Sequence, residues 1–196
     1  MREGFGPPAH LPRWAVALLL AAVAAIVVAV LAGGEDRRHL VLDSADPQFN
    51  LLYDDGVLRR ATPQPGEVLR LEAARDGVRA AVVVRPIAID AYRGDVSSGV
   101  LPVLAERHLQ ELDRDLPGFA LTDEGRARVN DSPGYQLGYG AEGELAGRDV
   151  FVVEGPQARR GYLISLQVRG RSAKARRMVF QARRAFRSFR FGTERA

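Results

Sequence analysis

Apolar and polar positions divide the chain into one uninterrupted apolar run and a longer region of short periodic segments. The run, residues 14–32, holds 19 residues without a polar side chain. As an α-helix it would extend about 28 Å at about 1.5 Å per residue, close to the roughly 30 Å hydrocarbon core of a bilayer. Trp14 follows Arg13 at its start, a pairing typical of a membrane interface. The run predicts a single transmembrane helix.

Two other interpretations compete with this anchor. A cleaved signal peptide has an apolar core of roughly 7–15 residues and a small-residue cleavage site, which residues 30–32 could supply. A buried helix of a globular domain shows a polar stripe, and residues 14–32 show none. A lipoprotein is excluded because the chain has no cysteine to carry the lipid.

The orientation of the anchor rests on weaker signals. Arg2 and Arg13 precede the run, and Arg37 and Arg38 follow it, so the count of basic residues is equal at the two ends. A short basic leader before an apolar run is typical of secreted and signal-anchored chains. We therefore expect a single-pass protein of the cell membrane with its C-terminal domain outside the cytoplasm.

The rest of the chain has room for one domain. About 160 residues follow the run, enough for one hydrophobic core. Without cysteine, the chain can form no disulfide, thiolate metal site or iron–sulfur cluster. The predicted organisation is an N-terminal tail (1–13), a transmembrane helix (14–32), a juxtamembrane stalk (33–47), an α+β domain (48–192) and a C-terminal tail (193–196).

The first part of the domain reads as strands. Residues 49–53 (FNLLY) form a short apolar run before the turn signal of residues 54–56. Residues 67–89 alternate as in a β-hairpin, with Asp76-Gly77 as its two-residue turn. Pro86 indicates an edge position or a bulge near the end of the second strand, because proline cannot donate to a sheet ladder.

A helix and a meander of strands follow the hairpin. Residues 99–116 carry apolar side chains at three- and four-residue steps, namely Leu101, Leu104, Ala105, His108, Leu112 and Leu116. We then expect one or two strands within 119–129 and further strands at 135–141 and 148–154, with Gly143 and Gly147 bracketing a turn.

The end of the domain shows first the two-residue period of a strand and then the roughly 3.6-residue period of a helix. Residues 162–169 alternate strictly, which predicts a half-buried strand. Residues 172–190 predict a closing helix with Ser172 as N-cap. Its buried stripe would be Met178, Ala182, Ala185, Phe186 and Phe189. The fold class is therefore α+β, an antiparallel sheet with two packed helices.

This order of elements resembles the PsbP-like superfamily, which includes the extrinsic PsbP proteins of photosystem II, Ran-binding Mog proteins and actinobacterial proteins of the LpqN type. The resemblance covers roughly residues 49–192. It rests on 49–53 (FNLLY), Asp76-Gly77, the helix near 101–116, and the segments 132–139 (SPGYQLGY), 161–166 (GYLISL) and 186–191 (FRSFRF). The chain departs from the family pattern at 54–56 (DDG), where such domains often carry Pro and then Trp. The resemblance implies a non-enzymatic accessory or binding domain and transfers no particular ligand.

The residues themselves offer little catalytic chemistry. His108 is the one histidine within residues 48–192, and could be a base or a metal ligand. We favour a core or half-buried histidine, because a metal site needs convergent ligands and no second His or Cys lies in that region. Ser97-Ser98 lacks a nucleophile motif, and the aspartate pairs 54/55 and 113/115 lack the spacing of a calcium loop. We expect no enzyme, no cofactor and no metal.

The distribution of charge is the one feature with functional content. The net charge is +4, but residues 157–196 contain twelve Lys or Arg and a single acid, Glu194. On the closing helix the basic face opposite the buried stripe contains an aromatic residue, Phe180. The candidate docking face, for anionic lipid or an acidic protein, is Arg176, Arg177, Phe180, Arg183, Arg184 and Arg187. The alternative is a solvated face, with Phe180 covered by a loop or by stacked arginines.

These observations favour a membrane-anchored binding or assembly module outside the cytoplasm. The alternative is a carrier that holds a small apolar ligand between the sheet and the helix 99–116, which would need a cavity there. Nucleic acid is a poor candidate partner because aromatic residues are not interleaved with the arginines as stacking positions. Nothing in the sequence requires an oligomer.

Overall fold

The computed structural model of the chain describes residues 37–42 and 44–192. The predicted transmembrane helix and both tails lie outside these residues. Within them, no helix is long and apolar enough to cross a membrane.

Strands dominate the described part of the chain, and two longer helices interrupt them. In order, the elements are β1 (Arg37–Leu42), β2 (Phe49–Asp54), β3 (Arg59–Ala61), β4 (Leu69–Arg75), β5 (Val78–Ala88), α2 (Val96–Gly99), α3 (Leu101–Asp115), β6 (Ala120–Val129), β7 (Ser132–Ala141), β8 (Leu145–Val153), β9 (Arg160–Arg169), the 3-10 turn η1 (Ala173–Ala175), α4 (Arg176–Arg187) and β10 (Arg190–Phe191).

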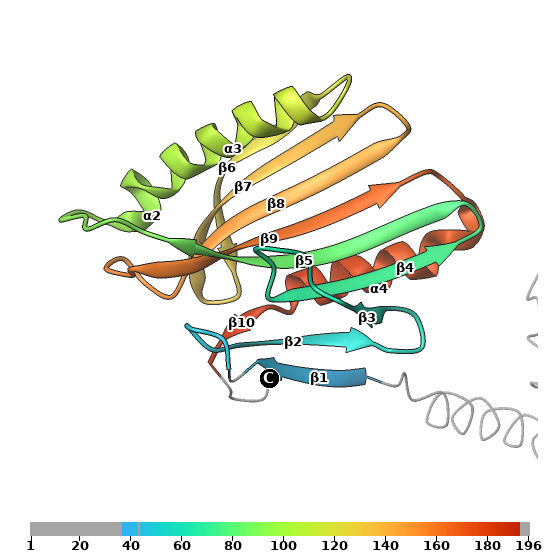
Figure 1. The fold of residues 1–196 in the computed structure, drawn as a ribbon, viewed down its shortest axis with the longest axis horizontal. Coiled ribbons are helices and arrows are strands. Elements are labelled where there is room, and N and C mark those ends of the chain that lie inside the picture. The colour runs from blue at the N-terminus through green and yellow to red at the C-terminus, as the bar shows by residue number, and fades with distance from the viewer. Residues whose placement is uncertain (1–36, 43, 193–196) are drawn as a thin grey trace, which may run out of the picture. The chain divides into compact units, whose positions relative to one another are not determined.

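The strands form two antiparallel sheets (Figure 1). The larger has seven strands in the order β3-β4-β5-β9-β8-β7-β6, and the smaller has three in the order β1-β2-β10. Every pair in both sheets is antiparallel. The α+β prediction is confirmed for the described residues.

The two longer helices lie on opposite faces of the seven-stranded sheet. Side chains alternate between the faces of a strand, and on β9 Ile164 belongs to the core cluster that includes α4, whereas Leu163 belongs to the cluster that includes α3. α4 packs on β4, β5 and β9 and also on β2, so it links the two sheets, while α3 packs on β7 and β8. We call these the α4 face and the α3 face.

The α4 face carries the larger core, and aromatic rings form its centre. Phe49, Tyr162 and Phe189 are fully buried, with ring centroids 4.9 Å apart for Phe49–Tyr162 and 5.1 Å for Phe49–Phe189. The Tyr162 hydroxyl donates to the Pro47 carbonyl at 2.5 Å, which satisfies its polar atom. The stripe predicted on the closing helix is buried here as expected.

The predicted hairpin is confirmed as β4–β5. Asp76 and Gly77 both have positive φ, 51° and 80°, which a two-residue hairpin turn requires and glycine and aspartate tolerate. Pro86 lies beyond the last β4 pair, Leu69–Val84, where β5 pairs only with β9. Pro86 therefore lies at the local sheet edge that the sequence predicted, where a residue without an amide donor is tolerated.

The segment 33–47 differs from the expected stalk. Arg37–Leu42 form β1, which pairs with β2 along its whole length from Arg37–Asp54 to Leu42–Phe49. Leu42 is buried in the core. The folded region therefore includes residues assigned to the stalk, because their apolar side chains complete the smaller sheet.

The segment 119–129, where one or two strands were expected, forms a single strand, β6, with a bulge between Leu121 and Asp123. The turn between β7 and β8 differs from expectation. Gly147 lies inside β8, and the turn is made by Gly143 and Glu144, whose φ angles are 69° and 55°. A Cβ at Gly147 would overlap the Tyr139 ring, so this glycine makes room for Tyr139.

The strand 162–169 is not half-buried. Residues 161–166 of β9 are all buried, because β9 lies in the middle of the sheet between the two helix-covered faces. Alternation in the sequence distinguished the two faces correctly but could not show that both are covered.

The closing helix is shorter than predicted. Ser172 caps η1 by accepting from the Lys174 amide at 3.3 Å, and α4 ends at Arg187. Asn130, in the β6–β7 turn with φ of 53°, donates from Nδ2 to the carbonyls of Arg187 (3.3 Å) and Phe189 (2.6 Å). This turn supplies a partner for the terminal carbonyls of the helix, after which the chain enters β10.

Candidate functional site

The residues of the predicted docking face lie on the exposed side of α4. Four of its arginines are exposed and Arg184 is half-buried. Phe180 is 61% exposed, so no loop or side chain covers most of its ring. The opposite stripe is packed into the core, which fixes the orientation of the helix. Among the described residues, Phe180 therefore stays largely uncovered on the basic face.

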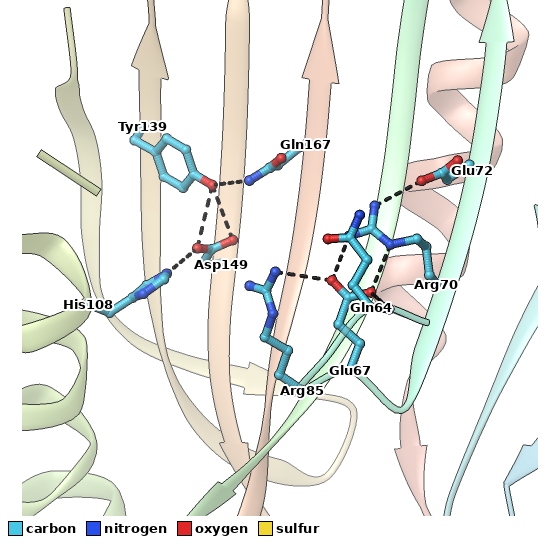
Figure 2. Close-up of polar contacts among 9 residues, drawn as sticks. All are labelled: Gln64, Glu67, Arg70, Glu72, Arg85, His108, Tyr139, Asp149 and Gln167. Atoms are coloured by element: carbon cyan, nitrogen blue, oxygen red, sulfur yellow. Dashed lines mark hydrogen bonds and ion pairs between the residues drawn. The ribbon is translucent and has the colours of Figure 1, made fainter. Parts of the chain in front are cut away.

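A polar network that the sequence did not predict lies on the α3 face (Figure 2). His108, from α3, places Nε2 2.6 Å from Oδ2 of Asp149 on β8, and the Asp149 side chain is 1% exposed. The other ring nitrogen, Nδ1, is 3.5 Å from Oε2 of Glu111, an exposed residue one turn further along α3. The His108–Asp149 contact joins α3 to the sheet through a buried carboxylate.

Two residues of neighbouring strands extend the network across the sheet. The Tyr139 hydroxyl on β7 lies 3.5 Å from both carboxylate oxygens of Asp149, and Gln167 on β9 donates from Nε2 to that hydroxyl at 3.2 Å. Figure 2 shows these side chains on one face of three adjacent strands. Among the described residues, no buried side-chain nitrogen or oxygen lacks a hydrogen-bond partner, as a buried polar network requires.

The network shifts the proton affinity of its members. Burial of the His108 ring acts to lower its pKa, but the hydrogen bond and charge of Asp149, with a smaller contribution from Glu111, raise it overall. The pKa of Tyr139 is raised by burial and by the neighbouring Asp149 carboxylate. His108 is therefore favoured in its charged form and Tyr139 in its neutral form.

An ionic cluster continues along the same face (Figure 2). The Glu67 carboxylate, 1% exposed, accepts from Nε of Arg70 at 2.8 Å and from its Nη2 at 2.5 Å, and Arg85 Nη2 lies 3.2 Å away. The Gln64 amide adds a further donor at 3.0 Å, and Glu72 accepts from Arg70 Nη1 at 2.8 Å. Burial acts to raise the pKa of Glu67, but these donors and charges lower it overall.

The His108–Asp149 pair places one ring nitrogen against a buried carboxylate, and the other ring nitrogen faces the exposed Glu111. Both imidazole nitrogens face carboxylates, so both act as donors when the ring is protonated, and no lone pair remains to accept a proton. Within residues 37–42 and 44–192, no group of three His, Cys, Asp or Glu side chains could hold a metal ion. The expectation of a half-buried histidine describes His108, but its carboxylate partner was missed.

The alternation of side chains along β8 could have identified Asp149 as a candidate buried partner. Asp149 shares a strand face with Phe151 and Val153, which are apolar, so a period-two pattern places its carboxylate toward a core. His108 likewise interrupts an apolar helical stripe. A lone acid and a lone histidine at inward positions of different elements signal a buried pair, although only the fold shows that they meet. Glu67, Arg70 and Arg85 carry no comparable signal.

Side chains occupy the space proposed for an apolar ligand. Leu101 and Ala105 of α3 pack against Leu137, Phe151 and Leu163 of the sheet, and all five are buried. The Phe151 ring also meets the His108 ring edge-on at 5.7 Å. A ligand between α3 and the sheet would have to displace these contacts.

Comparisons with known proteins identify the fold. No protein-family model and no curated protein sequence matches the chain. Among solved structures, the solution structure of cyanobacterial PsbP (CyanoP) from Synechocystis sp. PCC 6803 aligns with 81% of this chain and 94% of its own, at 12% identity and a TM-score of 0.54.

Two further structures align at lower TM-scores. LpqN, described as involved in cell envelope biogenesis of Mycobacterium tuberculosis, aligns over 78% of this chain and 90% of its own, with 16% identity and a TM-score of 0.49. A Pseudomonas aeruginosa protein of unknown function aligns over 82% and 98%, with 18% identity and a TM-score of 0.43. The resemblance inferred from the sequence is confirmed at the level of fold: the domain is similar to PsbP-like proteins.

Proposed function

We propose that this chain is a non-enzymatic binding or assembly module, anchored in the membrane by residues 14–32, with its domain outside the cytoplasm. The basic face of α4 docks an anionic partner, either an acidic protein or anionic lipid headgroups. The short basic leader before the apolar run supports this location.

The exposure of Phe180 carries this proposal. A phenylalanine that is 61% exposed on a helix whose other face is fully packed has no role in the core. Arginines flank it in sequence on both sides, and aromatic and arginine side chains are the residues that most often dominate binding energy at protein interfaces. Guanidinium groups also pair bidentately with carboxylates and phosphates.

The chemistry of the α3 face supports a function without catalysis. The imidazole of His108 lies between the carboxylates of Asp149 and Glu111, and although burial lowers its pKa, these carboxylates raise the pKa overall. Nucleophilic catalysis would need a base with a free lone pair beside a nucleophile. The buried network is better suited to holding α3 on the sheet than to transferring a proton.

Charge reversal on α4 tests the docking face. The full chain, reconstituted in phosphatidylcholine nanodiscs, would be mixed with phosphatidylglycerol vesicles, and binding measured by co-flotation. A photoreactive phenylalanine analogue at position 180 would label an acidic protein partner in intact membranes. We expect vesicle binding or protein labelling, and its loss in the variant Arg176→Glu/Arg183→Glu/Arg187→Glu.

A matched variant controls for net charge. Arg75, Arg107 and Arg114 are exposed arginines away from α4, and their replacement by glutamate changes the net charge by the same amount. That variant should keep both signals. The docking proposal fails if the α4 variant retains binding, or if both variants lose it equally.

Protease added to intact cells tests the location. External protease should remove the domain and leave a short membrane-embedded fragment. Complete protection until the membrane is opened would place the domain in the cytoplasm and overturn the proposed orientation. Release of the whole chain from the membrane fraction would instead indicate a cleaved signal peptide.

A further inference from the structure

Within the described part of the chain, the strand β6 ends the seven-stranded sheet and pairs on one side only, with β7 (Figure 1). It is ten residues long, and all of them except Val129 are exposed or half-buried. An exposed edge strand is a template for pairing with another chain, and charged side chains on such an edge restrict which chain can pair. The charges of β6 therefore identify a compatible partner.

These charges complement each other when β6 meets a second copy of itself. In a two-fold antiparallel pair, one residue lies opposite its own copy and its neighbours pair symmetrically on either side. With Gly125 on the axis, Glu124 of each copy lies opposite Arg126 of the other.

Neighbouring registers do not share this complementarity. An axis at Asp123, Glu124 or Arg126 places two identical charges opposite each other. An axis at Ala127 places Arg126 opposite Arg128. Like charges directly opposite across a strand pair are destabilising, so the sequence of β6 favours the register centred on Gly125.

The structure leaves the two pairing residues accessible. Glu124 and Arg126 are both exposed, and they lie opposite Leu137 and Tyr135 of β7, so they project from the same face of the sheet. Asp123 is engaged on the other face, where Gln136 Nε2 donates to it at 2.8 Å. A Cβ at Gly125 would meet no atom within 4 Å, so none of the described residues lies against this face of the strand centre.

We propose that two copies of this chain associate through β6, antiparallel about Gly125, and join their seven-stranded sheets edge to edge. The bulge between Leu121 and Asp123 limits the regular part of the strand, so the paired segment is short and the dimer is weak. This inference uses a different surface from α4 and does not depend on the proposed docking function.

A pair of cysteine variants tests the register. The chain has no cysteine of its own, so introduced thiols are unique. Full chains carrying Glu124→Cys would be mixed with full chains carrying Arg126→Cys under mild oxidation. In the proposed pair these thiols are directly opposite, with Cα atoms about 4.5–5.5 Å apart, within disulfide range. The second Arg126–Glu124 contact of the same dimer stays intact.

Either variant alone is the matched control. Its cysteine lies diagonally from its own copy, about 7–8 Å away, which is beyond disulfide range. We expect about tenfold more covalent dimer in the mixture than in either variant alone. Equal cross-linking in all three samples, or none in the mixture, would overturn the proposal.

A charge swap tests the energetic basis. Sedimentation equilibrium of the full chain in detergent should show dimerisation about tenfold weaker for Glu124→Arg or for Arg126→Glu, because both contacts become repulsive. The double variant Glu124→Arg/Arg126→Glu should recover wild-type dimerisation. An unchanged thermal midpoint would show that each variant folds. Monomeric wild-type chain at all concentrations, or failure of the double variant to recover, would refute the proposal.

Discussion

The two faces of the seven-stranded sheet differ in what they bury: the α4 face buries apolar side chains, and the α3 face also buries charged groups. On the α4 face the central strands bury only apolar side chains, and the aromatic cluster of Phe49, Tyr162 and Phe189 packs between them and the smaller sheet. On the α3 face the apolar cluster is smaller and continues into the His108–Asp149 network and the Glu67 cluster.

Because of this difference, we expect the α4 face to contribute mainly to the free energy of folding and the α3 face mainly to the fixed position of α3. Apolar burial contributes about 25 cal/mol per Å² without regard to direction, so the α4 face supplies most of the driving force for folding. Charge-assisted hydrogen bonds require one geometry, so the α3 face fixes where α3 sits on β7 and β8. Substitutions on the two faces should therefore differ in size and in pH dependence.

The largest effect is expected on the α4 face. Phe189→Ala removes a fully buried ring that contacts Phe49, Tyr162 and Phe191. The free energy of unfolding should fall by about 3–5 kcal/mol, measured by urea denaturation in detergent. Phe180→Ala is the matched control, and its exposed ring should contribute within about 0.5 kcal/mol. Similar losses for both would contradict the division between core and docking residues.

A smaller loss is expected from the buried acid of the α3 face. Asp149→Asn keeps the shape of the side chain but removes the charge that pairs with His108. We expect a loss of about 1.5–3 kcal/mol, the usual range for hydrogen bonds to charged groups. Glu111→Gln removes the exposed partner of the same ring and should change the free energy of unfolding far less. An equal effect of the two would show that burial of Asp149 is unimportant.

The Glu67 cluster should contribute less again. Glu67→Gln weakens two hydrogen bonds from Arg70. The loss should be about 1 kcal/mol, because the arginine side of the cluster is partly open to water, which screens the charges. Glu72→Gln, at a half-exposed partner of the same arginine, is the control and should be near neutral. Urea midpoints at pH 7 would compare the two variants, and a larger loss from Glu72→Gln would reverse the assignment.

The smallest effect is a pH dependence confined to the α3 face. The pKa of His108 is raised above its ordinary value of 6.5, so the folded state holds the proton more tightly than the unfolded chain. The resulting stabilisation is complete below pH 6.5 and is lost as pH rises through the folded-state pKa. Urea denaturation from pH 5.5 upward should show this decline, and His108→Gln should abolish it. A wild-type stability that increases with pH over this range would contradict the proposed charge pair.

Local pattern predicted most elements because each depends on residues near in sequence. The hairpin at Asp76-Gly77 follows from turn chemistry, and the stripe of α4 follows from helical period. The clustering of arginines on one face of α4 was also predictable, because one helix carries all of these residues. The exposure of Phe180 was not, since it depends on what other segments leave uncovered.

The sequence by itself determined the α+β class, the two helices, the hairpin and the arginine face of α4, because turn preference and periodicity are encoded within single segments. Only the tertiary structure decided that β1 belongs to the folded region, that β9 is buried on both faces, and that His108 meets Asp149 across 41 positions of chain. These features depend on which elements become neighbours. That choice is made by the burial of whole faces, and a single segment does not contain it.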